Sequence, residues 1–191
     1  MMSNPKVLIV DDDPAWLEEL VPLFSNANYD VETAPSFDLA RDKLLTTAYA
    51  AIIIDLELEP SEVPQTFEGF GLLSGIRFLE ELPRRQGKAI VLSAYGGVEQ
   101  MRRAFKRGAY DFIQKQEFDK DTFLDTVREA VELWKSSRDM APQRELTPEE
   151  KKEYKRVTRQ FLRGQPIQFD VPEDAVNPWA KQSQASNKGC S

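Results

Sequence analysis

The stretch KVLIVDDDP, residues 6–14, sets a short apolar run directly before three consecutive aspartates and a proline. An apolar run of this length is typical of a buried strand. Three adjacent carboxylates repel one another, and burial makes each charge more costly. The aspartates are therefore either solvated turn residues or the partners of something positively charged.

Four further apolar runs have the character of strands, and segments with helical periodicity separate them. The run AIIID, residues 51–55, is continuous and β-branched, as in a strand that is buried on both faces. The remaining runs span 29–34, 89–94 and 110–115, and the helical segments span 15–27, 37–47, 72–82, 98–108 and 119–137. Five strands that alternate with five helices predict an α/β fold built on a doubly wound, five-stranded parallel sheet.

Polar residues follow or end most of the apolar runs. They are, in chain order, Asp11, Asp12, Asp55, Ser93 and Lys115. In a parallel sheet the carboxyl ends of the strands meet at one edge, where such folds bind their ligands. Clustered carboxylates tolerate each other when they share a hard divalent cation such as Mg²⁺. A pair of aspartates after a single strand is more often part of a turn, so the prediction of a metal site depends on the whole set.

The third aspartate of the opening stretch has a separate interpretation. Asp13 precedes Pro14, and proline is favoured at the first position of a helix. An aspartate at the preceding position caps the helix by accepting a hydrogen bond from a backbone N–H. We therefore expect a structural role for Asp13, which leaves Asp11 and Asp12 as the candidate metal ligands.

The composition excludes several kinds of chemistry. The 191 residues contain no histidine and one cysteine, Cys190. Catalytic triads with histidine, a histidine phosphocarrier and cysteine-rich zinc sites are therefore excluded. No run of about 18 apolar residues is present to cross a membrane, and the first residues lack the pattern of a secretory signal. With 41% hydrophobic and 30% charged residues, the chain is predicted to be a globular cytoplasmic protein.

Together these features resemble the receiver domain of two-component response regulators across residues 5–137. The aspartate pair after the first strand, the lone aspartate after the third, the Ser-Ala pair of the fourth and the lysine after the fifth stand in that family's order and approximate spacing. The resemblance implies a flavodoxin-like fold and a signalling module that catalyses only its own Mg²⁺-dependent phosphorylation and dephosphorylation. It also implies a sensor histidine kinase or histidine phosphotransfer protein as donor, and a downstream protein that the sequence does not identify.

The resemblance further assigns roles to the acidic residues. Asp55 is implied as the phosphoacceptor. Asp11 and Asp12, together with Asp55 and the backbone carbonyl of Glu57, are implied as the ligands of Mg²⁺.

The remaining residues of the set are implied to bind or sense the phosphoryl group. Lys115, the hydroxyl of Ser93 and the backbone N–H of Ala94 would contact phosphoryl oxygens. Phe112 matches an aromatic residue that turns inward in the family once the hydroxyl engages the phosphoryl group. The alternative for Phe112 is an ordinary aromatic residue of the last strand.

Three features depart from the family pattern. Gln116 follows the lysine where the family usually has proline, often after a cis peptide bond, so a trans bond is expected here. The loop after the acceptor is longer by about six residues if Gly69 aligns with the family's glycine before the third helix, and the acidic insert 59–68 is either a lid, a partner-binding segment or a passive surface loop. Glu57 adds a carboxylate near the acceptor, where it would orient or repel water and so alter the lifetime of the phosphoryl group.

The composition changes near Ser137. Residues 1–137 carry 15 basic and 24 acidic residues, a net charge of −9, whereas residues 138–191 carry 10 and 8, a net charge of +2. The second part is predicted to consist of a linker, a basic amphipathic helix and a mostly irregular or disordered tail, spanning 138–147, 148–164 and 165–191.

The predicted helix 148–164 supports two interpretations. Between Lys151 and Arg163 it has six basic residues and one acidic residue. Such a helix either packs on an acidic receiver, with homodimerisation as one consequence, or makes the protein a DNA- or membrane-associated regulator. Nucleic-acid binding is the weaker prediction, because a compact helical DNA reader needs further helices. A phosphatase of the haloacid dehalogenase type, with Asp55 as nucleophile, is disfavoured because Glu57 stands where that family needs a second aspartate.

Overall fold

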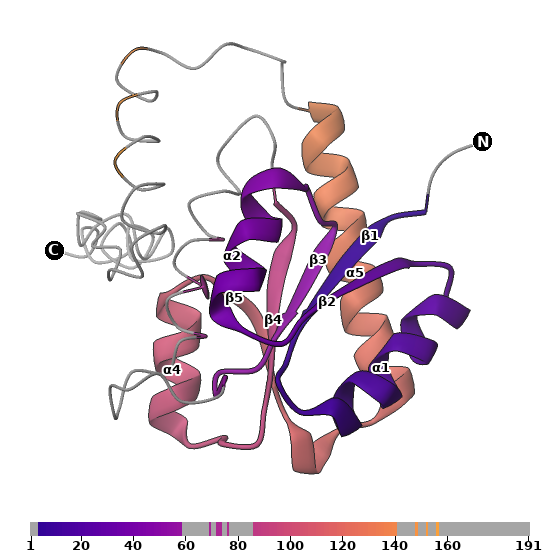
Figure 1. Ribbon diagram of the computed structural model, residues 1–191, viewed down its shortest axis with the longest axis vertical. Coiled ribbons are helices and arrows are strands. Elements are labelled where there is room, and N and C mark those ends of the chain that lie inside the picture. Colours follow the sequence, from indigo (N-terminus) through magenta and orange to yellow (C-terminus); the bar gives the residue numbers. More distant parts are fainter. Residues whose placement is uncertain are drawn as a thin grey trace, which may run out of the picture.

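Five strands form one sheet in the part of the chain that the computed structural model describes, residues 4–58, 69, 72, 73, 76, 86–140, 148, 152 and 156 (Figure 1). The strands are β1 (Lys6–Val10), β2 (Asp30–Ala34), β3 (Ala51–Ile54), β4 (Lys88–Ser93) and β5 (Ala109–Gln114). Each coincides with an apolar run of the sequence, with small differences at the ends. The prediction of five strands is confirmed.

The strands are parallel and lie in the order β2-β1-β3-β4-β5. Val7 of β1 lies between Val31 of β2 and Ala51 of β3. The chain therefore adds strands on one side of β1 and then on the other, and the order reverses between β1 and β3. Ligands of such sheets bind at the carboxyl ends of the strands beside this reversal. The predicted doubly wound parallel sheet, with its flavodoxin-like strand order, is confirmed.

Helices connect the strands and cover both faces of the sheet. The described helices are α1 (Pro14–Asn26), α2 (Phe37–Thr46), α4 (Val98–Lys106) and α5 (Lys120–Met140), and a 3-10 turn, η1 (Lys115–Glu117), precedes α5. Figure 1 shows α2 and α4 on one side of the sheet and α1 and α5 on the other. Of the helix predicted over 72–82, Leu72, Leu73 and Ile76 are described, and all three are helical and buried.

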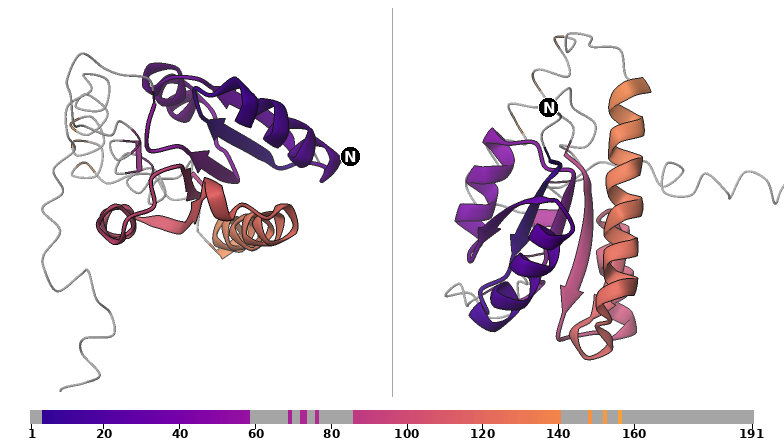
Figure 2. Two further views of the ribbon diagram at one scale, coloured as in Figure 1. Left: turned by 90° about the horizontal axis from the view of Figure 1, so that it is seen from below. Right: turned by 90° about the vertical axis from the view of Figure 1, so that its right-hand side faces the viewer.

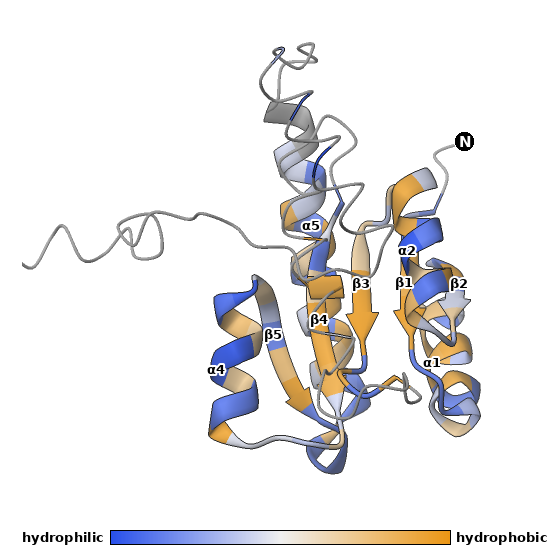
Figure 3. Ribbon diagram, turned by 60° about the vertical axis from the view of Figure 1, so that its left-hand side comes forward, coloured by the Kyte–Doolittle hydropathy of each residue, from blue (hydrophilic) through white to orange (hydrophobic). Residues whose placement is uncertain are grey.

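Apolar side chains are buried on both faces of the sheet, as the sequence of β3 predicts. Successive strand residues point to opposite faces. Ile52 and Ile54 therefore join the core that contains α2 and α4, whereas Ile53 joins the core that contains α1 and α5. Figure 3 shows β1, β3 and β4 as largely hydrophobic along their length. Because helices cover both faces, the central strands β1, β3 and β4 are left open mainly at their ends.

Asp13 caps α1, as the sequence predicts. Its carboxylate accepts a hydrogen bond of 2.9 Å from the backbone N–H of Ala15, and Pro14 is the first residue of the helix. Caps of this kind satisfy backbone donors that the first turn of a helix leaves without partners. The cap starts α1 directly after the aspartate pair, which fixes the backbone that carries Asp11 and Asp12.

A network of ion pairs links β1, β2 and α2. The carboxylate of Glu32 accepts hydrogen bonds from Lys6, Lys43 and the hydroxyl of Tyr49 at 2.8, 2.7 and 3.0 Å. The bond from Lys43, followed by that from Lys6, holds the pKa of Glu32 at about 2. Tyr49 is fully buried, and burial raises the pKa of its hydroxyl. The network therefore stabilises the contacts among β1, β2 and α2 electrostatically.

Helix α5 continues to Met140 and so extends past Ser137 into the predicted linker, 138–147. Figure 2 shows the last turns of α5 extending beyond the edge of the sheet. The residues from Arg138 to Met140 carry no glycine or proline that would end a helix. A change in charge composition is therefore a poor marker for the end of this helix.

Little of the second, basic part of the chain falls within the description. The described residues of the predicted helix 148–164 are Pro148, Lys152 and Arg156, each helical and exposed. Most of the predicted linker and all of the predicted tail, 165–191, lie outside the described residues. Within the described part of the chain, no helix combines the length and the apolar character that a membrane span requires.

Candidate functional site

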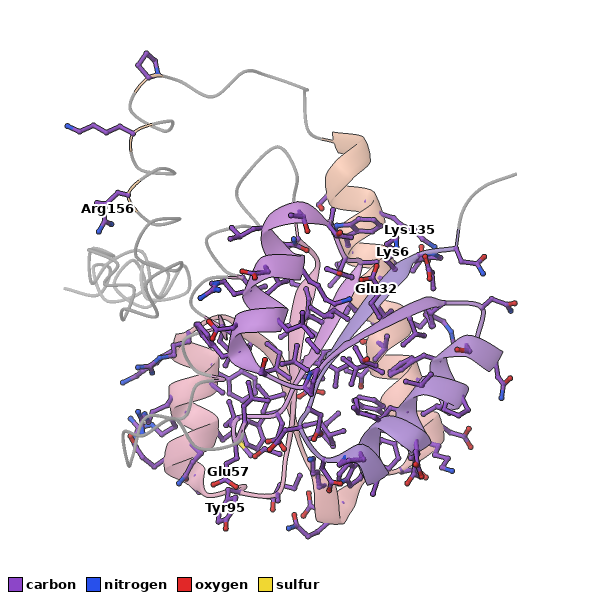
Figure 4. All side chains as sticks on the ribbon, in the orientation of Figure 1. Lys6, Glu32, Glu57, Tyr95, Lys135 and Arg156 are labelled. Carbon is purple, nitrogen blue, oxygen red and sulfur yellow. The ribbon has the colours of Figure 1, made fainter. Side chains whose placement is uncertain are left out.

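The polar residues singled out in the sequence lie at one edge of the sheet. Asp11, Asp55 and Lys115 directly follow β1, β3 and β5, and Ser93 is the last residue of β4. These four strands are neighbours in the sheet, so parallel pairing brings their carboxyl ends together. Figure 4 shows Glu57 and Tyr95 at this end of the molecule, and Lys6 and Glu32 toward the opposite end.

Three carboxylates converge at this edge. Asp11, Asp12 and Asp55 each offer a carboxylate oxygen within 4.8 Å of those of the other two. Asp11 and Asp55 are buried, whereas Asp12 is half-buried. Hard oxygen donors at this spacing suit a divalent cation such as Mg²⁺, which also keeps several water ligands. The three predicted aspartates therefore fit a metal ion.

The ammonium group of Lys115 supplies positive charge among these aspartates. Its Nζ lies 2.8 Å from Oδ2 of Asp11 and 2.7 Å from Oδ2 of Asp55. The side chain of Lys115 is 8% exposed, and those of the two aspartates are 3% and 7% exposed. The lysine directly after the last strand is therefore a positive partner for Asp11, the first of the three consecutive aspartates. With three carboxylates and one ammonium, the site still favours a further cation.

Burial and pairing change the protonation equilibria of the site. Burial raises the pKa of Asp11 to about 6, although the hydrogen bond from Lys115 opposes this. Burial alone would lower the pKa of Lys115, but the hydrogen bonds to Asp11 and Asp55 outweigh it and raise that pKa. Burial, followed by the negative charge of neighbouring aspartates, raises the pKa of Glu57. Because the Asp11 carboxylate is buried, a neighbouring cation stabilises its ionised form.

The two carboxylate oxygens of Asp55 have different partners. Oδ1 accepts a hydrogen bond of 3.1 Å from the backbone N–H of Glu57, and Oδ2 accepts one of 2.7 Å from Lys115. The first bond fixes the turn after β3, which carries the carbonyl of Glu57. The second is charge-assisted and short, as expected for an ammonium and a carboxylate. Together they hold the Asp55 side chain in one orientation.

Ser93 and the loop after it have defined hydrogen bonds. Ser93 is fully buried, and its Oγ accepts a bond of 3.3 Å from the backbone N–H of Tyr95. In that bond the hydroxyl keeps its own proton to donate elsewhere. The carbonyl of Ala94 accepts a bond of 2.9 Å from Nε2 of Gln116. Among the described residues no peptide bond is cis, so the expected trans bond before Gln116 is confirmed.

Phe112 lies on β5 beside Val91 of β4, and its side chain is buried. The ring belongs to the hydrophobic core that also contains residues of α2 and α4. Phe112 is either a switch residue or an ordinary aromatic residue of the strand, and both interpretations require a buried ring. The switch role of Phe112 therefore stays a prediction.

Gly69 packs against the backbone of the acceptor. Its N–H donates a hydrogen bond of 3.4 Å to the carbonyl of Leu56, and a Cβ at this position would lie 2.5 Å from the carbonyl oxygen of Asp55. Only glycine fits so close an approach. This position suits the proposed alignment of Gly69 with the glycine before the family's third helix. The insert 59–68 lies outside the described residues.

Sequence reasoning missed two contacts of the site. The ammonium nitrogen of Lys115 lies 5.1 Å from the centroid of the Trp16 ring, and Gln116 bonds to Ala94 as described above. Trp16 falls on the apolar stripe of α1 and therefore looks like a core residue in the sequence. Both contacts depend on how separate segments meet in space, which hydrophobic periodicity does not encode.

The fold and the site define a class of protein, a doubly wound α/β domain with a cluster of aspartates and a lysine at the reversal point of its sheet. A family model for the response regulator receiver domain matches residues 7–128. The chain belongs to the response regulator receiver domain family.

Known proteins of this kind include longer regulators. The chain is 27% identical over 143 residues to the nitrogen assimilation regulatory protein NtrX of Azorhizobium caulinodans, covering 74% of this chain and 29% of NtrX. It is 30% identical over 140 residues to the transcriptional regulatory protein TdiR of Thauera aromatica, covering 71% of this chain and 53% of TdiR. The chain therefore spans about half the length of TdiR and less of NtrX.

Solved structures agree with the fold. The crystal structure of a CheY-like receiver domain protein from Methanospirillum hungatei JF-1 matches with a TM-score of 0.59 and 23% identity, covering 71% of this chain and 99% of that chain. The crystal structure of NtrX from Brucella abortus matches with a TM-score of 0.59 and 26% identity, covering 71% of this chain and 29% of that chain.

Proposed function

We propose that this protein accepts a phosphoryl group on Asp55 from a sensor histidine kinase or a histidine phosphotransfer protein, and that it signals through a phosphorylation-dependent interaction with a downstream protein. One observation carries the proposal: Lys115 contacts both Asp55 and Asp11 at the reversal point of the sheet. An acceptor carboxylate, a cation and further acids in one place are what phosphoryl transfer requires.

The proposed transfer uses Asp55 as a nucleophile. A carboxylate oxygen of Asp55 attacks the phosphorus of the donor phosphohistidine, and a P–O bond forms. The P–N bond breaks, its electron pair goes to the imidazole, and that ring takes up a proton. In the reverse change of state, water attacks the phosphorus, the P–O bond breaks, and inorganic phosphate leaves as the carboxylate is restored.

Three groups of the chain are assigned the role of stabilising the negative charge that spreads over the phosphoryl oxygens in a loose transition state. They are the ammonium of Lys115, the hydroxyl of Ser93 and the backbone N–H of Ala94. Donors held in place before the reaction stabilise such charge without reorganising. The bond from Gln116 to the carbonyl of Ala94 supports this loop, because it ties the turn after β5 to it.

The acidic cluster is assigned to Mg²⁺. Asp11, Asp12 and Asp55, with the backbone carbonyl of Glu57, would hold the ion, and the carboxylate oxygens within 4.8 Å of one another support this assignment. When bound, Mg²⁺ supplies positive charge beside the transferred group. Glu57 places one further carboxylate near the acceptor, where it affects the water that ends the phosphorylated state.

The proposed signal passes through the two switch residues, Ser93 and Phe112. Engagement of Ser93 with the phosphoryl group would draw Phe112 with it and change the surface formed by α4, β5 and α5. A downstream protein, or a second copy of this chain in a homodimer, would read that surface. A cytoplasmic location, where the kinase presents its phosphohistidine, belongs to the same proposal.

Mass spectrometry tests the assignment. After incubation with acetyl phosphate and Mg²⁺, we expect one added phosphoryl group in the wild type and in Asp42→Asn, a control at an exposed position of α2. We expect none in Asp55→Asn. Equal labelling of Asp55→Asn and wild type would show that the acceptor is elsewhere. A panel of phosphorylated histidine kinases then identifies the donor.

The alternative of a DNA- or membrane-associated regulator rests on the basic residues of the predicted helix 148–164, of which only Pro148, Lys152 and Arg156 are described. A gel-shift series at low and moderate salt tests its nucleic-acid arm, because phosphate contacts make binding steeply salt-dependent. The absence of a shift at low salt would remove it.

A further inference from the structure

Lys115 contacts an aromatic ring as well as two carboxylates. Its ammonium nitrogen lies 5.1 Å from the centroid of the Trp16 ring, within the range of a cation–π interaction. Trp16 belongs to the first turn of α1, which the Asp13 cap starts. The ammonium group is thus bounded by Asp11, Asp55 and an indole.

Trp16 is held by a row of aromatic rings that reaches into the core. Its ring meets Phe118 edge-on at 5.2 Å, Phe118 meets Phe123 at 5.2 Å, and Phe123 meets Phe24 at 5.7 Å. Phe24 and Phe123 are fully buried between α1 and α5. Phe118 directly follows η1, the turn that begins with Lys115. The ring that orients Trp16 therefore lies next to the turn that carries the lysine.

The lysine needs such support for the proposed reaction. Its side chain is a flexible four-carbon stem with a point charge at the end. Before transfer, the carboxylates of Asp11 and Asp55 fix the ammonium. After transfer, the attacking oxygen of Asp55 is bonded to phosphorus in an acyl phosphate, and the ammonium has to move toward the phosphoryl oxygens. The face of an aromatic ring attracts a cation anywhere within about 6 Å above its centroid, so it can hold the ammonium through a small movement.

We infer that Trp16 is a positioning residue for Lys115. It keeps the ammonium out of solvent and within reach of the acceptor. The inference rests on the proposed phosphoryl transfer at Asp55, and it assigns Trp16 no contact with the phosphoryl group itself.

Pulsed labelling with an amine reagent tests the inference without any phosphoryl donor. We expect Trp16→Leu to increase the labelling rate of Lys115 about three- to tenfold and Trp16→Phe to leave it within about twofold of the wild type, because phenylalanine keeps an aromatic face. The matched control is Trp134→Leu, which removes an indole from the same hydrophobic cluster. Faster labelling in the control as well, or equal labelling of Trp16→Phe and Trp16→Leu, overturns the inference.

A second measurement leaves Trp16 in place. It therefore tests the inference even if the Trp16→Leu variant fails to fold. With Trp134 and Trp179 replaced by phenylalanine, Trp16 is the remaining indole. Removal of the ammonium in Lys115→Met should change its emission intensity, whereas Lys120→Met, which removes a lysine paired with Glu19 on α1, should not. Unchanged emission in Lys115→Met overturns the inference.

The rate of phosphorylation by acetyl phosphate completes the test. In Trp16→Leu it should fall by about the factor by which Lys115 labelling rises, and Trp16→Phe should restore it. A normal phosphorylation rate in Trp16→Leu despite exposed Lys115 overturns the positioning role. If the wild type takes up no phosphoryl group while the labelling result holds, the proposed function fails and the Trp16–Lys115 contact stands.

Discussion

The ammonium nitrogen of Lys115 lies 2.7 Å from Oδ2 of Asp55, although the two residues are 60 positions apart in the chain. Asp55 follows β3 and Lys115 follows β5, and β4 lies between these strands in the sheet. The ion pair therefore spans a whole strand at the edge where the carboxyl ends of the strands meet. It contributes to folding and, under our proposal, to transfer, and the two contributions can be measured separately.

The substitution Lys115→Met should affect both the stability of the fold and the rate of phosphoryl transfer. Phosphorylation by acetyl phosphate should slow by roughly two orders of magnitude, because a preorganised donor is lost. Without divalent cation, the free energy of unfolding should fall by about 3 kcal/mol, because two buried carboxylates lose their partner. Urea denaturation measures this second effect. The control Lys120→Met, at an exposed ion pair, should change stability by less than about 1 kcal/mol.

In the same variant, added Mg²⁺ should recover part of the lost stability, since the ion replaces the missing positive charge among the carboxylates. A Lys115→Met protein that is as stable as the wild type without Mg²⁺ would contradict the energetic role of the ion pair.

Replacement of Asp11 and Asp12 by alanine should abolish the rise in melting temperature that Mg²⁺ produces. In the absence of Mg²⁺ the double variant should be at least as stable as the wild type, because two carboxylates that repel Asp55 are removed and Lys115 keeps one partner. Calorimetry with and without Mg²⁺ measures both effects. Asp42→Ala, at an exposed site, should retain the full Mg²⁺ response, and an equal response in the double variant would rule out this site.

Glu32 should contribute a pH-dependent part of the stability. Its folded-state pKa of about 2 lies below the ordinary value of 4.5. Between these values the unfolded chain binds a proton on Glu32 and the folded chain does not, so stability falls as the pH falls from about 4.5 to 2. At neutral pH the difference is worth roughly 3 kcal/mol.

Glu32→Gln should therefore be less stable than the wild type at pH 7, and its stability should fall less steeply below pH 4.5. Urea midpoints over this pH range provide the measurement. Glu99→Gln, at an exposed position of α4, serves as the control and should keep the wild-type slope. Parallel curves for Glu32→Gln and the wild type would show that the ion-pair network does not shift this carboxylate.

The basic part of the chain allows one further prediction. Deletion of residues 148–191 should change the oligomeric state or lower the melting temperature, because a short basic helix gains most of its stability by packing on another surface. Phosphorylation at Asp55 should persist in the truncated protein. Analytical ultracentrifugation and calorimetry measure the first two quantities, and unaltered values for both would show that the helix does not pack on a receiver.

The strands were predictable from local sequence, and the acidic cluster was predictable because parallel pairing brings the carboxyl ends of the strands to one edge. The β-branched run before Asp55 marks a strand buried on both faces, and Asp13 with Pro14 marks the start of α1. The contact of Trp16 with Lys115 was not predictable, because it depends on the angle at which α1 meets the turn after β5. The end of α5 at Met140 was missed because a shift in composition is not a helix-stop signal.

The close approach of Gly69 to the backbone of Asp55 and Leu56 brings the two ends of the intervening segment together beside the acceptor. The entropic cost of closing a loop rises only slowly with its length once its ends are fixed. Residues can therefore be gained or lost between these ends while the acceptor stays in place. A receiver built in this way is able to acquire a new recognition segment next to its phosphorylation site without rebuilding the site.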